Sequence, residues 1–108
     1  CAADATGHGT HVAAVVSGRR YGVAKSSMLH AVKVLNDEGT GWLSWTISAL
    51  DWVSRKGVAP KVAVLNAETT GTSKSLQRAV DFANLVGRIA LVAGAGVTGG
   101  DTCANLPA

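Results

Sequence analysis

The chain has 108 residues, of which 47% are hydrophobic and 16% charged, and its formal net charge is +3. This composition is typical of one globular α/β domain and excludes a disordered tail. No apolar run approaches the ~20 residues of a membrane span. The basic residues are scattered rather than interleaved with aromatics. We therefore expect neither a membrane nor a nucleic acid as partner.

Both ends resemble interior segments. The chain begins at Cys1 without an initiator methionine and stops at the loop-like residues Leu106, Pro107 and Ala108. We expect residues 1–108 to be an internal fragment of a single catalytic domain, so the lack of a signal peptide says nothing about location. Two cysteines, Cys1 and Cys103, do not define the redox compartment.

The first element is predicted from Gly7-His8-Gly9-Thr10-His11 and the apolar run that follows it. This pattern predicts a short buried helix over about 9–17 with His8 at its first turn, where an imidazole can serve as a general base. A structural role, as a cap or a partly buried side chain, is the alternative for a single histidine. Metal ligation by His8 and His11 lacks the further ligands that zinc needs, so we assign no metal.

Alternating strands and helices are predicted for the rest of the chain. Short apolar runs predict strands over 29–35, 61–66 and 88–93. Apolar residues at helical spacing predict helices over 43–55 and 74–86, the second capped by Ser73 or Ser75. This order predicts an α/β fold with a three-layer, doubly wound parallel sheet, incomplete in this segment.

The carboxyl ends of the predicted strands lead into loops over 36–41, 66–71 and 94–96 that are rich in Gly, Thr or Asn. Ligands of open α/β sheets bind at that edge. Each loop alone could be an ordinary turn. Three loops on the same edge as a histidine at a helix start favour a binding site.

Residues 7–13 resemble the histidine motif of the subtilisin-like serine proteases, in particular the proteinase K-like branch. Residues 21–25, 32–35 and 39–41 match the stretch that follows in that family, and residues 101–108 look like the loop leading to its substrate pocket. The resemblance implies a serine-type endopeptidase that hydrolyses peptide bonds, in which His8 takes the proton from a serine. It further implies substrate-binding residues in three places: Gly39, Thr40 and Gly41 at an edge that pairs with an extended peptide, Leu43 in a distal subsite, and Asn66, Ala67 and Glu68 after the central strand.

The resemblance carries expectations for the whole protein. It implies a secreted monomer that acts on a peptide or protein substrate. It implies no cofactor in this segment, with calcium as the ion that the full-length protein could bind. It also implies that Cys103 pairs with a cysteine further along the parent chain and not with Cys1.

Several residues depart from the family pattern. Asp4 lies too close to His8 to be the catalytic aspartate, and no serine lies in the family's nucleophile motif, so we expect the segment alone to be inactive. The family's Ser-Leu-Gly-Gly is replaced by Asn66-Ala67-Glu68-Thr69, and its oxyanion asparagine by Ala95. Losing one oxyanion donor lowers turnover by roughly 10²–10³. A non-catalytic peptide-binding homologue is therefore the alternative function.

A dinucleotide-binding domain is the least favoured alternative. Residues 94–99 read G-x-G-x-x-G directly after a predicted strand, as in that class of proteins. The following residues lack a helical apolar period and contain Pro107. A helix beginning near Gly99 would support this alternative, and an irregular loop would argue against it.

Overall fold

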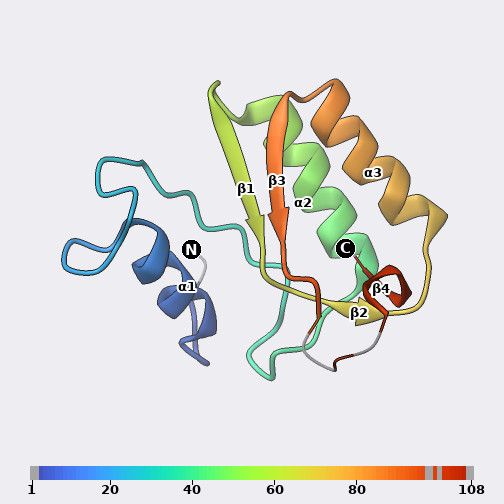
Figure 1. Ribbon diagram of the computed structural model, residues 1–108, viewed down its shortest axis with the longest axis horizontal. Helices are drawn as coiled ribbons and strands as arrows, with labels where there is room; N and C mark the ends of the chain where they lie inside the picture. Colours follow the sequence, from blue (N-terminus) through green and yellow to red (C-terminus); the bar gives the residue numbers. More distant parts are fainter. Residues whose placement is uncertain (1–2, 97–98, 100, 107–108) are drawn as a thin grey trace. The chain divides into compact units, whose positions relative to one another are not determined.

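The computed structural model describes residues 3–96, 99 and 101–106, and the chain divides into two compact units, residues 1–41 and 42–108. In chain order the elements are α1 (His8–Ser17), α2 (Leu43–Lys56), β1 (Lys61–Leu65), β2 (Thr69–Thr70), α3 (Lys74–Leu85), β3 (Ile89–Ala93), the 3₁₀ helix η1 (Thr102–Ala104) and β4 (Asn105–Leu106) (Figure 1).

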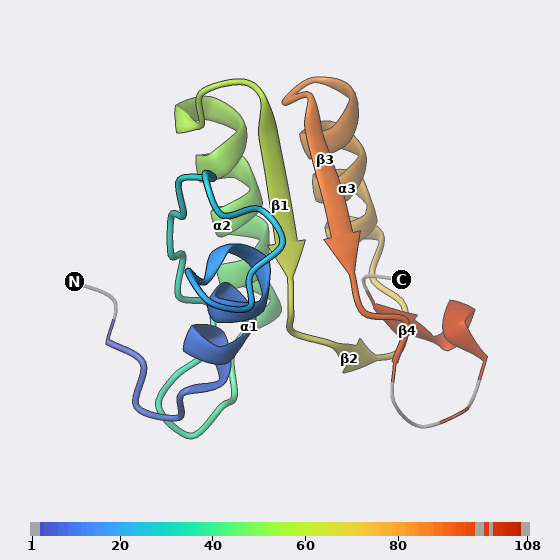
Figure 2. The same cartoon turned by 60° about the vertical axis from the view of Figure 1, so that its left-hand side comes forward.

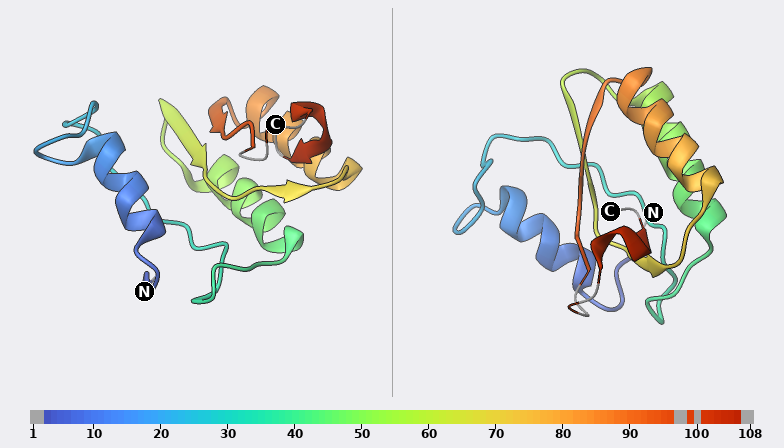
Figure 3. Two further views of the ribbon diagram at one scale, coloured as in Figure 1. Left: turned by 60° about the horizontal axis from the view of Figure 1, so that its bottom comes forward. Right: turned by 45° about the vertical axis from the view of Figure 1, so that its right-hand side comes forward.

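A parallel sheet of β1 and β3 organises the second unit. Its register runs from Lys61 opposite Ile89 to Leu65 opposite Ala93. Parallel neighbours need a crossover connection, and here that connection contains α3. Helices α2 and α3 lie side by side on one face of the sheet, as the right-hand view of Figure 3 shows. The predicted parallel α/β arrangement is confirmed.

The core of this unit lies between the two helices and the sheet. Its four buried side chains are each at most 3% exposed, and they are Leu50, Leu76, Ala83 and Ile89. Alternate residues of a strand point to opposite faces. Accordingly Ala63 and Leu91 pack against the core, whereas Val62, Val64 and Val92 are exposed. The helices therefore cover one face of the sheet.

Local signals set the ends of α3. The Ser73 side chain accepts a hydrogen bond from the Leu76 N–H at 3.3 Å, which decides between the two predicted caps. Beyond the other end, a Cβ on Gly87 would lie 2.7 Å from the Ala83 carbonyl oxygen and 2.8 Å from Ser54 Oγ of α2. Glycine at this position lets the end of α3 approach α2 closely.

All three predicted helices are confirmed, with ends within one residue of those predicted.

The strand predicted over 29–35 is wrong. This segment contains neither helix nor strand, and it pairs with no other described part of the chain. A strand requires hydrogen bonds from a neighbour, which an apolar run alone does not supply. Residues 29–33 are exposed, and only Val34 and Leu35 are half-buried.

A second, two-stranded ribbon is present that the sequence patterns did not predict. Strands β2 and β4 pair antiparallel, with Thr69 opposite Leu106 and Thr70 opposite Asn105 (Figure 2). Two-residue strands are too short to show a hydrophobic period. The chain after β1 therefore enters this ribbon before it reaches α3.

Helix α1 is the regular element of the first unit, and the prediction that it is buried is wrong. None of its residues is fully buried, and Val15 is 54% exposed. The residues after the helix satisfy two of its final carbonyl groups, because the Val23 N–H donates to Val15 O at 3.4 Å and the Ala24 N–H to Val16 O at 2.8 Å.

In the described part of the chain, no helix has the length and apolar character required to cross a membrane.

Replacing Leu76 with alanine is expected to lower the free energy of unfolding by about 2–5 kcal/mol, because the change leaves a cavity in the core. Leu85 on the same helix is 78% exposed. Its replacement by alanine should change the free energy of unfolding by less than about 0.5 kcal/mol. Urea unfolding followed by circular dichroism measures both variants. Equal losses would contradict this packing.

Candidate functional site

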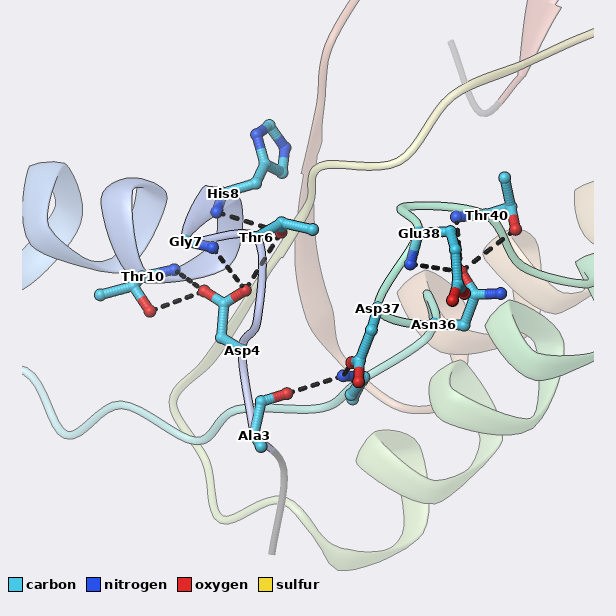
Figure 4. A network of polar contacts seen from close by, with 11 residues as sticks. Ala3, Asp4, Thr6, Gly7, His8, Thr10, Asn36, Asp37, Glu38 and Thr40 are labelled. Atoms are coloured by element: carbon cyan, nitrogen blue, oxygen red, sulfur yellow. Dashed lines mark hydrogen bonds and ion pairs between the residues drawn. The ribbon is translucent and has the colours of Figure 1, made fainter.

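His8 is the first residue of α1, one residue before the predicted start of the helix, and it lies at the first turn as the sequence predicts. The preceding residue, Gly7, has a φ of 78°, a left-handed conformation that favours glycine. The His8 N–H donates to Thr6 Oγ1 at 3.4 Å. The residue is exposed, and its ring points away from Asp4 (Figure 4). His8 thus presents an imidazole at the start of a helix.

Asp4 caps this helix from outside. One carboxylate oxygen, Oδ2, accepts from the Thr10 N–H at 2.8 Å and from Thr10 Oγ1 at 2.6 Å. The other, Oδ1, accepts from the Gly7 N–H at 3.0 Å and from Thr6 Oγ1 at 3.2 Å. A negative charge at a helix N-terminus also interacts favourably with the helix dipole. Gly7 has no side chain with which to cap the helix, and Asp4 supplies the capping group.

The same hydrogen bonds act on the ionisation of Asp4. The Thr10 hydroxyl and the Thr10 N–H contribute most to lowering the pKa of Asp4 from 3.8 to about 2. Desolvation opposes this shift, and the Gly7 N–H and the Thr6 hydroxyl add smaller contributions that lower the pKa. Because the folded-state pKa is depressed, the stabilisation is fully present above pH 3.8 and is lost as the pH falls through about 2. Asp4 is therefore ionised at neutral pH.

A second polar turn forms the edge predicted to bind substrate. Asn36 Oδ1 accepts from the Thr40 N–H at 2.9 Å, the Thr40 hydroxyl at 3.1 Å and the Glu38 N–H at 3.2 Å. The Asn36 N–H donates to Thr40 O at 2.7 Å, and the Gly39 N–H donates to Asn36 O at 3.1 Å. Gly39 has a φ of 78°. A single asparagine thus fixes the backbone that leads into the predicted edge at Gly41.

Two further contacts restrain this turn. The Lys33 ammonium forms an ion pair with Asp37 and donates to Ala3 O at 2.7 Å (Figure 4). The start of the turn is thereby tied to the residue before Asp4. At the end of the turn, a Cβ on Gly41 would lie 2.2 Å from Val34 O. Only glycine allows that approach of the two backbone segments.

The second unit brings together the other predicted site residues. Leu65 and Ala93 are register partners, so the segments that begin at Asn66 and at Gly94 leave the sheet at one edge. Asn66 and Glu68 are exposed and Ala67 is half-buried. Ala95 is exposed, and its methyl group donates no hydrogen bond.

Leu43 begins α2 at the same end of the sheet, where the arrowheads of β1 and β3 lie (Figures 1 and 2). Its side chain is half-buried and packs against the buried core. Leu43 therefore has a structural role, and its role in a distal subsite stays a prediction.

The sequence patterns missed the roles of Asp4 and Asn36. Asp4 lies six residues before Thr10, the residue whose N–H it accepts from. The standard sequence signatures of helix capping do not include this spacing. Asn36 was detectable, because asparagine before Asp-Glu-Gly is typical of a turn in which the side chain accepts from the following backbone.

Other expectations concern metals, cysteines and the glycine-rich loop. Among the described residues, no group of three or more His, Cys, Asp or Glu side chains is placed to hold a metal ion. Cys103 is exposed and forms no disulfide with any residue that the structure describes. Cys1 lies outside those residues, so it stays a prediction that Cys1 and Cys103 are not bonded to each other.

The G-x-G-x-x-G segment lies partly outside the described residues, at positions 97 and 98. After Gly99 the described residues form η1, of three residues, and β4, rather than an α-helix. This geometry argues against dinucleotide binding, because that class of site needs a helix N-terminus after the glycines.

Comparison with known proteins decides the family. The model of the Subtilase family matches residues 2–101. The chain belongs to the subtilase family. The chain is 44% identical over 108 residues to the extracellular serine proteinase of Thermus sp. (strain Rt41A). The aligned region covers 99% of this chain and 26% of that protein. The chain is 39% identical over 107 residues to alkaline serine exoprotease A of Vibrio alginolyticus, covering 99% of this chain and 20% of that protein.

A crystal structure shows the same fold. The crystal structure of a cold-adapted subtilisin-like serine proteinase superposes on this chain with a TM-score of 0.92 and 37% sequence identity. The match covers 97% of this chain and 38% of the chain of that proteinase. The predicted subtilisin-like α/β fold is confirmed. This subtilase chain spans about a quarter of the length of the curated relatives it matches.

Replacing Thr10 with valine is expected to raise the pKa of Asp4 from about 2 towards 3.8, because valine lacks the hydroxyl whose hydrogen bond lowers that pKa most. Carboxyl NMR titration of Asp4 measures the change. Thr40→Val, which removes a hydroxyl from the Asn36 turn, is the matched control and should leave the Asp4 titration unchanged. An unaltered Asp4 pKa in Thr10→Val would refute the assignment.

Proposed function

We propose that this chain is part of a subtilisin-like serine endopeptidase that hydrolyses peptide bonds, and that His8 is its catalytic base. The observation that carries the proposal is the position of His8, which is exposed at the first residue of α1 within a sequence that resembles the family's histidine motif. Membership of the subtilase family supports it.

In the proposed mechanism His8 accepts the proton of a serine hydroxyl as the serine oxygen attacks the substrate carbonyl carbon. His8 then donates that proton to the leaving amine. The serine and the aspartate that orients the imidazole are supplied by segments of the protein outside these 108 residues. Asp4 is not that aspartate, since its carboxylate accepts hydrogen bonds from Thr10, Gly7 and Thr6.

We assign substrate binding to the backbone groups of two sets of residues. Gly39, Thr40 and Gly41 would pair with an extended peptide, since a strand-like edge binds through main-chain hydrogen bonds. The Asn36 turn supports this role because its hydrogen bonds, which already engage the Gly39 N–H and the N–H and O of Thr40, hold in place the backbone that leads to Gly41. Asn66, Ala67 and Glu68 would bind from the carboxyl edge of the sheet.

For the whole protein we propose a secreted monomer that acts on peptide or protein substrates. The relatives from Thermus and Vibrio support a proteinase, and the Thermus protein is named as extracellular. Calcium binding by the full-length protein stays a prediction.

A non-catalytic peptide-binding homologue is the second candidate function, favoured by Ala95. In that case the site would retain the peptide edge at 39–41 but lack the donor that stabilises the oxyanion. Hydrolysis by the intact protein distinguishes the two candidates.

Replacing His8 with alanine in the intact protein is expected to remove nearly all peptide hydrolysis, because no other group would accept the serine proton. His11→Ala, which alters an exposed side chain of the same helix, is the matched control and should retain activity. Initial rates on a chromogenic peptide measure both. The 108-residue chain alone should release no product. Activity of that chain that a serine-directed inhibitor blocks would contradict the proposed location of the nucleophile.

Replacing Ala95 with asparagine is expected to raise turnover by roughly 10²–10³, since a side-chain amide would donate to the developing oxyanion. The gain should appear in kcat more than in KM, because the donor acts in the transition state. Ala95→Leu, which adds bulk without a donor, should give no gain. An equal kcat for the asparagine variant and the original protein would show that position 95 does not hold the oxyanion.

A further inference from the structure

The Asp4 carboxylate contacts the chain on both sides of His8. Its Oδ1 atom accepts from the Gly7 N–H, one residue before His8, at 3.0 Å. Its Oδ2 atom accepts from the N–H and the hydroxyl of Thr10, two residues after His8, at 2.8 and 2.6 Å. The backbone that carries His8 is therefore held at two points by one side chain.

A third link reaches the His8 backbone itself. Thr6 Oγ1 donates to Asp4 Oδ1 at 3.2 Å and accepts from the His8 N–H at 3.4 Å. Asp4 thus receives four donors, as many as the lone-pair sites of a carboxylate. Such charge-assisted hydrogen bonds are about twice as strong as neutral ones. Because its pKa is lowered to about 2, the Asp4 carboxylate is ionised across the pH range in which a histidine can serve as a base.

We propose that Asp4 is the positioning residue of His8: its hydrogen bonds to Gly7 and Thr10 set the start of α1 and with it the direction of the imidazole. The inference rests on the proposed function of His8 as the catalytic base. The hydrogen bonds of the Asp4 carboxylate go to Thr6, Gly7 and Thr10, and in Figure 4 the His8 ring points away from it. Its effect on catalysis is therefore carried by the backbone.

Positioning of this kind affects turnover, because a displacement of about 1 Å in a reacting group can cost roughly 10²-fold in rate. A purely structural role for Asp4 would have a different result. It would lower the melting temperature and the amount of folded protein while each folded molecule kept its kcat. The two roles are distinguished by kcat per folded molecule.

The test uses Asp4→Asn and Asp4→Ala in the intact protein, assayed well below the melting temperature, with the folded fraction measured by circular dichroism. We expect kcat per folded molecule to fall by about 10- to 100-fold while KM changes little. Asp81→Asn is the matched control. Asp81 is exposed on α3, where it accepts from Gln77 Nε2 at 3.0 Å, and its replacement should leave kcat unchanged.

Variants of Thr10 keep the test decisive if an Asp4 variant does not fold. Thr10→Val should lower kcat, and Thr10→Ser, which retains the hydroxyl, should restore it. Asp4→Asn combined with Thr10→Val should lower kcat by less than the product of the single effects, because both changes remove the same contact.

His8→Ala in the same assay separates this inference from the proposed function. Hydrolysis that survives His8→Ala would refute His8 as the base and the positioning of that base together. Loss of hydrolysis in His8→Ala with an unchanged kcat in Asp4→Asn and Thr10→Val would refute only the positioning role. Loss in His8→Ala with a reduced kcat in Asp4→Asn and rescue by Thr10→Ser would support it.

Discussion

The parallel register of β1 and β3 is the constraint on which the second unit depends. Parallel strands cannot be joined by a tight turn, so the chain must cross over the sheet, and α3 lies in that crossover. The burial of Leu76 and Ala83 of α3 with Ile89 of β3 follows from this connection. The same register ends both strands at one edge, where Leu65 faces Ala93. The core of this unit and the placement of its candidate site residues, Asn66 to Glu68 and Ala95, both follow from this one pairing.

The first unit is organised differently, by polar side chains that satisfy backbone N–H groups. Asp4 does so at the start of α1 and Asn36 does so in the turn before Gly41. Among the described residues of this unit, Gly22 alone is fully buried, and it carries no side chain. Hydrogen bonds at turns therefore fix the conformation of residues that lack a surrounding core.

Sequence reasoning succeeded where structure is encoded locally. The spacing of Leu43, Ile47, Leu50 and Val53 is sufficient to predict α2, because one face of a helix must be apolar to pack. It failed for 29–35, since a strand depends on a distant partner that no local pattern specifies. The histidine motif predicts a role for His8 through resemblance to a family, whereas the Asp4 contacts depend on how the chain folds back before α1, which no sequence pattern specifies. Ala95 was found as a departure from that family's pattern.

The left-handed conformations of Gly7 and Gly39 have a consequence for how firmly the two turns can be held. Glycine loses more conformational entropy on folding than any other residue. Elsewhere in a chain, exchanging glycine for alanine can reduce that loss. At these two positions a Cβ would find open space around it, yet a φ of 78° strains an L-amino acid. A residue of the opposite chirality, such as D-alanine, would adopt this φ without strain and would lose less conformational entropy than glycine on folding. Ribosomal synthesis cannot supply one, so the turns beside His8 and Thr40 keep the entropic cost of glycine, and the carboxylate of Asp4 and the amide of Asn36 offset it.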